Sequence, residues 1–573
     1  MNTQMADRVP VLVVGGSLVG LSASLFLGRL GVPHLLVERH AETSRHPRGR
    51  GNNLRTMELF RTAGVEEDVR AAASVLADNH GILQAETLSG GEQEWLFREI
   101  DPGGGLARFS PSSWCLCSQN DLEPVLLRHA AERGDLRFNT ELTAFEQDAD
   151  GVTARLLDRA TGEEREVRAD YLVAADGPRS PVRERLGIGQ SGRGDLFHNV
   201  SVTFRAKRLA EVVGDRRFIA CYLTDPAGAG ALLPVDNREQ WVFHLPWHPE
   251  RGESVEDFTD LRCAAHIRAA AGVPDLDVEI TGRAPWHAAE RVADRYGAGR
   301  VFLVGDSAHE MPPTGAFGSN TGIQDAHNLA WKLAAVLAGW GGPRLLESYE
   351  SERRPVAVQT AARAAARSVE HQHPGFDAAP AAGPRTNVLA VALGYRYPEG
   401  ALVGADATAG VVPERFAATG EPGTRAPHLW LRDAAGTRLS TLDLFDGGPL
   451  LLAPAAGGGH WPAAARLVAR QTGVPLRCLL VGDGGDLLPE PPADIPSGAR
   501  PAGPVSPTTW PEAYGLHPGG AALVRPDGFV GWRATGAVGD PAGPCGSACA
   551  GWPAWPDSVT AGRGPAARVP VRL

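Results

Sequence analysis

The chain has 573 residues, of which 43% are hydrophobic and 21% are charged. This is a globular composition, and the length exceeds what one hydrophobic core usually organises, so we expect two or three domains. A net charge of -11 without any basic block excludes a nucleic-acid surface. The seven cysteines form no CxxC pair, which argues against a metal site or a disulfide scaffold. Without an apolar run of membrane-spanning length or a signal peptide, the sequence predicts a cytoplasmic protein without a membrane partner.

The first fifty residues predict a dinucleotide-binding unit. An apolar run at 9–14 leads into the turn GGSLVG (15–20), an apolar helical pattern and a second strand that ends at Glu38. In such a unit the glycines permit a sharp turn and close approach to a pyrophosphate, and the acid binds a ribose. Ser17 replaces the usual middle glycine. By itself the motif is therefore also compatible with a glycine-rich turn that binds no nucleotide.

Two further motifs follow along the chain. The segment DYLVAADG (170–177) predicts a strand that ends in Asp176, a weak signal because many strands end in Asp-Gly. The segment from 300 to 333 predicts a buried strand, then Asp306, a Pro/Gly-rich loop and a helix capped by Asn320 or Thr321. The carboxylate of Asp306 could bind the hydroxyls of a polyol chain, and the N-terminus of the helix could stabilise negative charge on a ring. This combination suits a flavin better than a nicotinamide.

With HPRGRGNNLRTMELFRTAGV (46–65) and SQNDLEPVLLRHA (118–130), these motifs resemble, in the same order, the FAD-dependent aromatic hydroxylases. These are single-component, class A flavoprotein monooxygenases that use FAD, NAD(P)H (NADPH or NADH) and O2. Two C-terminal segments, GTRAPHLWL (423–431) and YGLHPGGAALVRPDGFVGWRA (514–534), are similar to the branch that acts on polycyclic aromatic polyketides. The resemblance implies a monomer or homodimer.

The reaction implied by the resemblance is ring hydroxylation through a flavin C4a-hydroperoxide, in antibiotic or pigment biosynthesis. A Baeyer–Villiger-type insertion or another oxidative rearrangement of a polyketide on the same scaffold stays open, as does, more remotely, a flavin-binding protein that is not an oxygenase. No catalytic acid or base stands out. His244 and His309 are candidates by position, but a histidine near a strand end is more often structural.

The predicted fold is α/β, with a Rossmann-like FAD-binding domain in two parts, 1–185 and 291–375. An antiparallel β-sheet substrate domain at 186–290 is inserted between them, and a thioredoxin-like domain at 385–573 ends in a Gly/Pro-rich tail. The third domain has no paired cysteines at the redox turn of thioredoxins. We therefore expect it to be structural or to contact a second subunit.

Four strand-like runs are expected in the inserted domain, at 199–206, 217–223, 229–235 and 240–246. Alternation places Trp241 and Phe243 on one face, and a wide apolar pocket would suit a fused-ring substrate. The predicted substrate residues are Tyr222, Leu232, Trp241, Phe243 and Pro313. An equally good interpretation is that these aromatic residues belong to the core.

The resemblance also implies which residues contact the cofactor, from the pyrophosphate turn and the ribose to the polyol chain and the isoalloxazine. They are Gly15, Ser17, Leu18, Val19, Gly20, Glu38, Arg39, Arg48, Gln119, Asp176, Asp306, Pro313, Gly318, Ser319 and Asn320.

Overall fold

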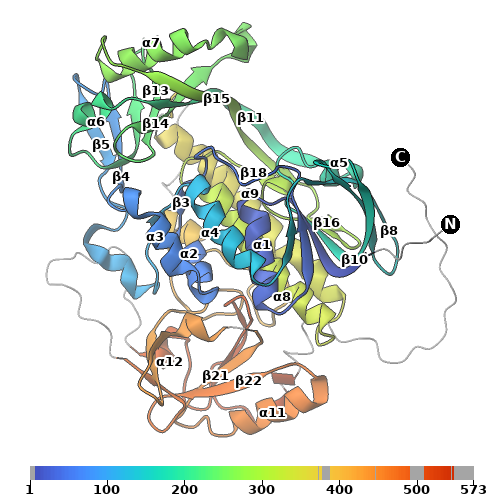
Figure 1. Cartoon of the computed structure of the whole chain (residues 1–573). Coiled ribbons are helices and arrows are strands. Elements are labelled where there is room, and N and C mark those ends of the chain that lie inside the picture. The colour runs from blue at the N-terminus through green and yellow to red at the C-terminus, as the bar shows by residue number, and fades with distance from the viewer. Residues whose placement is uncertain are drawn as a thin grey trace, which may run out of the picture.

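A computed structural model describes residues 7–371, 373–376, 387–445, 447–490, 509–543 and 545–546. The chain forms three lobes (Figure 1), with a helix-covered sheet in the middle, a second sheet above it and a third lobe, drawn in orange, below. Most of the predicted Gly/Pro-rich tail lies outside the described residues.

The middle lobe is built on a mainly parallel sheet in the order β16-β17-β10-β1-β2-β7, with the hairpin β8-β9 attached to β10. Because β1 lies between the parallel strands β2 and β10, Val11, Leu12 and Val13 are fully buried, and this explains its continuous apolar sequence. The strands are β1 (Asp7–Val14), β2 (His34–Val37), β7 (Asp135–Arg137), β8 (Thr140–Gln147), β9 (Val152–Asp158), β10 (Glu164–Ala174), β16 (Gly297–Ala298) and β17 (Val301–Leu303).

Helix α1 is central to this lobe, since it packs against both α4 and α8. A small two-stranded sheet of β3 (Gly51–Asn52) and β6 (Cys115–Leu116) also belongs to this lobe. The helices of the lobe are α1 (Leu18–Arg29), α2 (Leu54–Thr62), α3 (Glu66–Ala72), α4 (Gln119–Ala131), α5 (Pro181–Arg185), α8 (Phe317–Leu337) and α9 (Arg344–Glu370).

The upper sheet has the order β18-β15-β11-β14-β13-β12-β4-β5 and is antiparallel except where β12 meets β4. The four predicted strands of the inserted domain are confirmed. Four further strands, β4, β5, β15 and β18, were not predicted, and β4 and β5 come from the range 1–185, so the sheet crosses the predicted boundary. The bounds are β4 (Gly81–Ala85), β5 (Gln93–Phe97), β11 (Gln190–Arg205), β12 (Phe218–Leu223), β13 (Gly230–Pro234), β14 (Gln240–Trp247), β15 (Glu279–Ala293) and β18 (His309–Glu310), with helices α6 (Arg208–Val213) and α7 (Asp260–Ala271).

The third lobe has the thioredoxin-like arrangement, in which a parallel βαβ unit is followed by an antiparallel pair. Helix α11 (Trp461–Thr472) connects the parallel strands β21 (Leu450–Pro454) and β22 (Arg477–Val481), and β24 (Ala521–Val524) and β25 (Val530–Ala534) extend the sheet. The turn before α11 contains no cysteine. The remaining elements are β19 (Trp430–Asp433), β20 (Arg438–Ser440), β23 (Leu487–Pro489), α10 (Val388–Ala392) and α12 (Trp510–Ala513).

Buried ion pairs join the third lobe to the middle lobe. The Arg525 guanidinium donates to both carboxylate oxygens of Glu352 on α9, at 2.8 and 2.7 Å, and the Lys332 ammonium on α8 donates to the same carboxylate at 2.8 Å. Arg425 pairs with Glu58 on α2. All these side chains are buried. Since unpaired buried charges are costly, the third lobe is an integral part of the fold.

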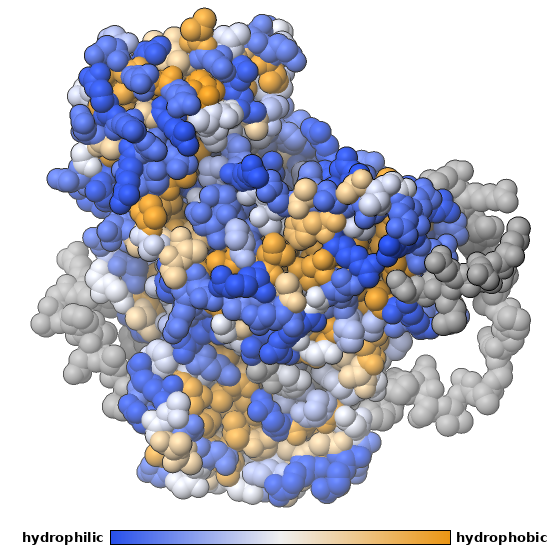
Figure 2. All heavy atoms as spheres, in the orientation of Figure 1, coloured by the Kyte–Doolittle hydropathy of each residue, from blue (hydrophilic) through white to orange (hydrophobic). Residues whose placement is uncertain are grey.

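The surface is mixed in character. The face shown in Figure 2 is largely hydrophilic, with hydrophobic atoms gathered over the middle of the molecule and on the third lobe. Among the described residues, no helix is both long and apolar enough to cross a membrane.

Candidate active site

A continuous cavity of about 3660 Å³ lies between the lobes. Pockets for a single small ligand usually measure about 300–1,000 Å³, so this one has room for two large molecules. Its lining includes the first turn of α1, the segment 37–51, the loop 310–316 with the start of α8, and one face of the upper sheet. Residues 427–430 of the third lobe also line it.

The glycine turn of the first motif lies on this cavity. Gly15 has φ +107°, and a Cβ there would lie 2.2 Å from the carbonyl oxygen of Ala175, so only glycine fits. Gly15, Ser17, Leu18 and Val19 all line the cavity, whereas Gly20 does not. A Cβ on Gly20 would lie 1.8 Å from the Gly15 oxygen, so Gly20 permits close packing of the turn on its own helix.

Ser17 has a structural reason to replace the usual glycine. Its hydroxyl donates to Glu123 Oε1 at 2.5 Å, and the same oxygen accepts the Leu18 amide at 3.2 Å and the Gln119 side-chain amide at 2.7 Å. The second oxygen of Glu123 accepts the Ser44 amide at 2.8 Å. The fully buried Glu123 thus connects α1, α4 and the segment before Arg48. Glu123 was not predicted, although its spacing of four residues after Gln119 on one helix was a usable signal.

Two predicted acids lie where the glycine turn meets the sheet. Glu38 lines the cavity beside Arg39, and its carboxylate accepts the Gly16 amide at 2.7 Å and the His40 amide at 2.8 Å. Asp176 accepts the Val182 amide at 3.1 Å through one oxygen, while its other oxygen has no partner among the described residues. Burial raises the pKa of Asp176.

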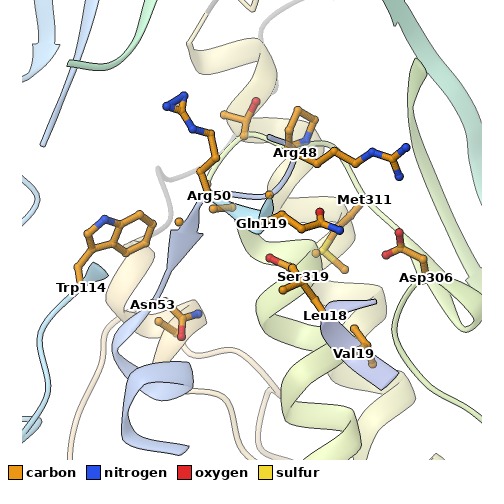
Figure 3. A pocket seen from close by; sticks show the side chains of 18 of the residues that line it. Leu18, Val19, Arg48, Arg50, Asn53, Trp114, Gln119, Asp306, Met311 and Ser319 are labelled. Carbon is orange, nitrogen blue, oxygen red and sulfur yellow. The ribbon is translucent and has the colours of Figure 1, made fainter. Parts of the chain in front are cut away.

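Asp306 points into the cavity from the turn after β17 (Figure 3). No side chain or amide in the described ranges bonds to its carboxylate, which is exposed to the cavity, and desolvation by the surrounding protein raises its pKa. The turn is supported from behind by Asp325, which accepts the Gly305 amide at 3.4 Å, His309 at 2.8 Å and Arg353 at 2.7 Å. His309 is fully buried in this network and does not line the cavity, which favours the structural interpretation of this histidine.

Helix α8 begins earlier than predicted. Ala316 adopts a left-handed backbone with φ +55°, which turns the chain so that the helix starts at Phe317. Asn320 is therefore not its cap and does not line the cavity. Its side chain donates to the Gly51 carbonyl at 2.8 Å and accepts the Asn53 amide at 2.9 Å, which fixes β3 beside the helix.

Pro313, Gly318 and Ser319 do line the cavity, together with the predicted residues Arg48 and Gln119. Figure 3 shows Gln119, Ser319, Arg48 and Asp306 around the same space. The first amides of α8 have no partner within the helix, so its N-terminus carries a partial positive charge. Because Gly318 and Ser319 line the cavity, this charge lies beside it.

Only one of the predicted substrate residues of the upper sheet, Tyr222, lines the cavity. Leu232, Trp241 and Phe243 lie on the opposite face, in a core shared with helix α7. The expectation for these three is wrong because alternation along a strand separates two faces but does not say which of them a helix covers.

Comparisons with known proteins match two family models to successive parts of the chain. Residues 8–364 match the model described as "FAD binding domain", and 419–553 match "Aromatic-ring hydroxylase, C-terminal". The chain belongs to the FAD-dependent aromatic-ring hydroxylases.

Relatives of this hydroxylase extend over nearly the whole chain. A Streptomyces halstedii protein named as a polyketide hydroxylase is 67% identical over 92% of this chain and 93% of its own. Tetracenomycin A2 monooxygenase-dioxygenase of Streptomyces glaucescens is 42% identical over 94% and 95%. The crystal structure of aklavinone-11 hydroxylase with FAD and aklavinone matches with a TM-score of 0.84 at 38% identity, covering 95% of this chain and 99% of that one.

FAD fits the residues that the hydroxylase presents. Two helix N-termini, those of α1 and α8, face the cavity and favour a pyrophosphate and an anionic ring. The free carboxylate of Asp306 and the unpartnered oxygen of Asp176 are acceptors without protein donors, as hydroxyl groups of a ligand require.

The rest of the cavity is a chamber under the upper sheet, and several of its polar residues were not predicted. Arg50 leaves Nε and Nη1 without partners among the described residues, and burial lowers its pKa to about 10. His244 on β14, already a candidate by its position in the sequence, lines the cavity too, and so do Arg367 on α9 and Trp286 on β15, which were not predicted. Their strands and helices gave no residue-specific signal in the sequence, because the chamber is assembled from segments far apart in the chain.

Proposed function

We propose that the protein is an FAD- and NAD(P)H-dependent monooxygenase that hydroxylates one ring of a polycyclic aromatic polyketide. The balanced reaction takes the aromatic C–H compound, O2, NAD(P)H and a proton to the phenol, NAD(P)+ and water. Bound FAD would supply the redox chemistry, from hydride acceptance to oxygen transfer.

The observation that carries the proposal is the continuity of the cavity. The cradle formed by Gly15, Asp306 and Ser319 opens directly into a chamber with apolar walls, among them Ala220, Leu233 and Ala288. A flat, fused-ring molecule in the chamber would therefore lie against the cofactor with little water around it. Exclusion of water protects a reactive oxygen species, and fixed proximity accelerates its transfer.

Residues of the chamber also suit an electron-rich phenolate. Burial raises the pKa of Tyr222 to about 12, so its hydroxyl remains a donor at neutral pH. Arg367 lines the same cavity, and its Nε is buried without a partner among the described residues. Together a hydroxyl donor and a cation would stabilise a substrate phenolate, whose ring is more nucleophilic than that of the phenol.

The test begins with the purified, FAD-loaded protein and the two ring systems of its relatives, aklavinone and tetracenomycin A2. We expect NAD(P)H to bleach the flavin absorbance faster when an accepted substrate is present, and we expect a product that carries one oxygen atom from labelled O2. Product structures come from mass spectrometry and NMR. A flavin that NAD(P)H never bleaches would contradict the proposal and favour a binding protein, whereas a lactone product would favour oxygen insertion beside a carbonyl.

A further inference from the structure

The chamber contains one histidine whose protonation state is fixed by a neighbouring side chain. His244 lies on β14, opposite Ser201 of β11 and Ala231 of β13, and all three line the cavity. The indole N–H of Trp286 on β15 donates to His244 Nδ1 at 3.1 Å, and the two rings meet edge to face with centroids 5.2 Å apart.

This contact determines where the imidazole proton lies. An indole nitrogen can only donate, so Nδ1 of His244 must accept and the proton of the neutral ring must be on Nε2. Burial, together with the nearby His373, His46 and Arg50, lowers the pKa of His244 to about 3, so the ring is neutral at physiological pH. Within the described ranges, His244 makes no other hydrogen bond. Its Nε2–H is therefore an unused donor in the chamber.

The surroundings favour a ligand rich in acceptor oxygens. The Tyr222 hydroxyl and the guanidinium groups of Arg50 and Arg367 are donors in the same cavity. Glu370 on α9 is an acid of the lining that lies close enough to raise the pKa of Arg367 through its charge. Carbonyl, quinone and phenolate oxygens on a fused-ring skeleton would satisfy such donors.

We propose that His244, held by Trp286, orients the substrate by donating Nε2–H to a carbonyl or quinone oxygen on its ring edge. This proposal rests on the function proposed above. A flat ligand between two walls can still rotate in its own plane, and a donor of fixed position and polarity removes that freedom. The contact would thereby select which ring carbon is presented to the flavin, so His244 is a specificity-determining residue and Trp286 is its positioning residue.

Three variants separate the parts of this proposal. His244→Leu removes the donor, while His244→Gln keeps an N–H group at the reach of Nε2. Trp286→Phe keeps an aromatic ring but removes the indole donor, so the imidazole proton can move to Nδ1. His266→Gln is the matched control, because His266 lies on α7 outside the cavity, bonds to the Ala229 carbonyl and contacts the opposite face of the same sheet through Phe243.

The probe is aklavinone, and binding is measured from the change in flavin absorbance without NAD(P)H. We expect His244→Leu to weaken binding about 3- to 10-fold, the size of one neutral hydrogen bond. With NADPH and O2, it should give a mixture of product isomers and more hydrogen peroxide per NADPH. His244→Gln should recover most of the isomer selectivity, Trp286→Phe should fall between, and His266→Gln should match the wild type.

The outcomes separate this proposal from the broader one. If the wild type oxygenates aklavinone and His244→Leu has the same affinity, isomer ratio and peroxide yield, the role of His244 is refuted and the proposed function stands. If the wild type binds aklavinone without oxygenating any polyketide tested, the proposed function fails and the binding data alone decide on His244. A wild type that binds neither aklavinone nor tetracenomycin A2 would overturn both proposals for this ligand class.

Discussion

Asp306 is expected to bind the cofactor at the expense of the stability of the cofactor-free protein. Its carboxylate is exposed to the cavity and has no partner in the described part of the chain, yet desolvation by the surrounding protein raises its pKa. Such a group destabilises the apoprotein and becomes favourable only when ligand hydroxyls donate to it. Asp306→Asn should therefore bind FAD more weakly but give an apoprotein at least as stable as the wild type.

The size of the effect follows from the single group involved. Hydrogen bonds to a charged partner contribute about 1.5–3 kcal/mol and neutral ones about 0.5–1.5 kcal/mol, so replacing the charge alone should cost about 1–1.5 kcal/mol. This corresponds to a Kd for FAD about 5- to 10-fold higher in Asp306→Asn. In Asp306→Ala the whole contact is lost, and the Kd should rise about 10- to 100-fold.

The assay is titration of apoprotein with FAD across acid and neutral pH, alongside urea denaturation of the apoprotein. Only the ionised carboxylate is a strong acceptor. Because the pKa of Asp306 is raised, wild-type affinity should fall as the pH decreases, beginning above the ordinary aspartate value of 3.8, and Asp306→Asn should lack this component. Asp483→Asn, an exposed site outside the cavity, is the control. Unchanged FAD affinity, or a loss of apoprotein stability in Asp306→Asn, would refute the reasoning.

Three further predictions concern packing. Ser17→Gly restores the common fingerprint but should lower the free energy of unfolding by about 1.5–3 kcal/mol, because the buried Glu123 loses a donor; tighter FAD binding at unchanged stability would contradict this. Trp241→Ala should lower the free energy of unfolding, measured by urea denaturation, by about 3–5 kcal/mol and leave the product isomer unchanged. An altered isomer would place Trp241 in the site. Arg525→Met removes the guanidinium that pairs with Glu352, so the free energy of unfolding should fall by about 3–5 kcal/mol. Flavin should then be released at a lower Tm, and an unchanged Tm would show that the ion pair does not hold the third lobe.

Two substitutions at exposed side chains serve as controls for the stability losses expected of the buried variants. Arg432 pairs with Glu490 at 2.7 Å, but half of its side chain is exposed, so Arg432→Met should cost no more than about 1 kcal/mol. Leu261 on α7 is 84% exposed, and Leu261→Ala should leave stability almost unchanged. Comparable losses in buried and surface variants would mean that burial does not set the cost.

The parts of the site that the sequence predicts are those where the backbone restricts the residue type. Gly15 has a positive φ that favours glycine, and Asp306 lies in the turn after the buried strand β17. Such positions depend on neighbours close in the chain. The spacing of residues along the sequence is therefore enough to identify the glycine turn and the acidic turn.

Contacts between distant segments could not be predicted in the same way. Strands β4 and β5 precede β12, the strand with which β4 pairs, by more than a hundred residues in the sequence. Their short apolar pattern does not indicate which strand they will pair with. The same limit applies to Trp241, because alternation does not reveal that α7 covers its face. Ser17 shows a subtler case, since its departure from the fingerprint has a reason only when Glu123 is seen beside it.

Asp325 and Glu352, which hold the fold together, differ from Asp306 and Asp176 on the cavity in how many donors reach their carboxylates. Away from the cavity, Asp325 and Glu352 each accept several donors, as buried acids in a stable fold must. Along the cavity, one oxygen of Asp176 and two nitrogens of Arg50 are buried without partners among the described residues, and no described residue donates to the carboxylate of Asp306, which is exposed to the cavity. Unsatisfied groups lower stability and persist where a ligand completes them. Sequence reveals the residue types in both sets, but only the folded chain shows which polar atoms remain for the cofactor and the substrate.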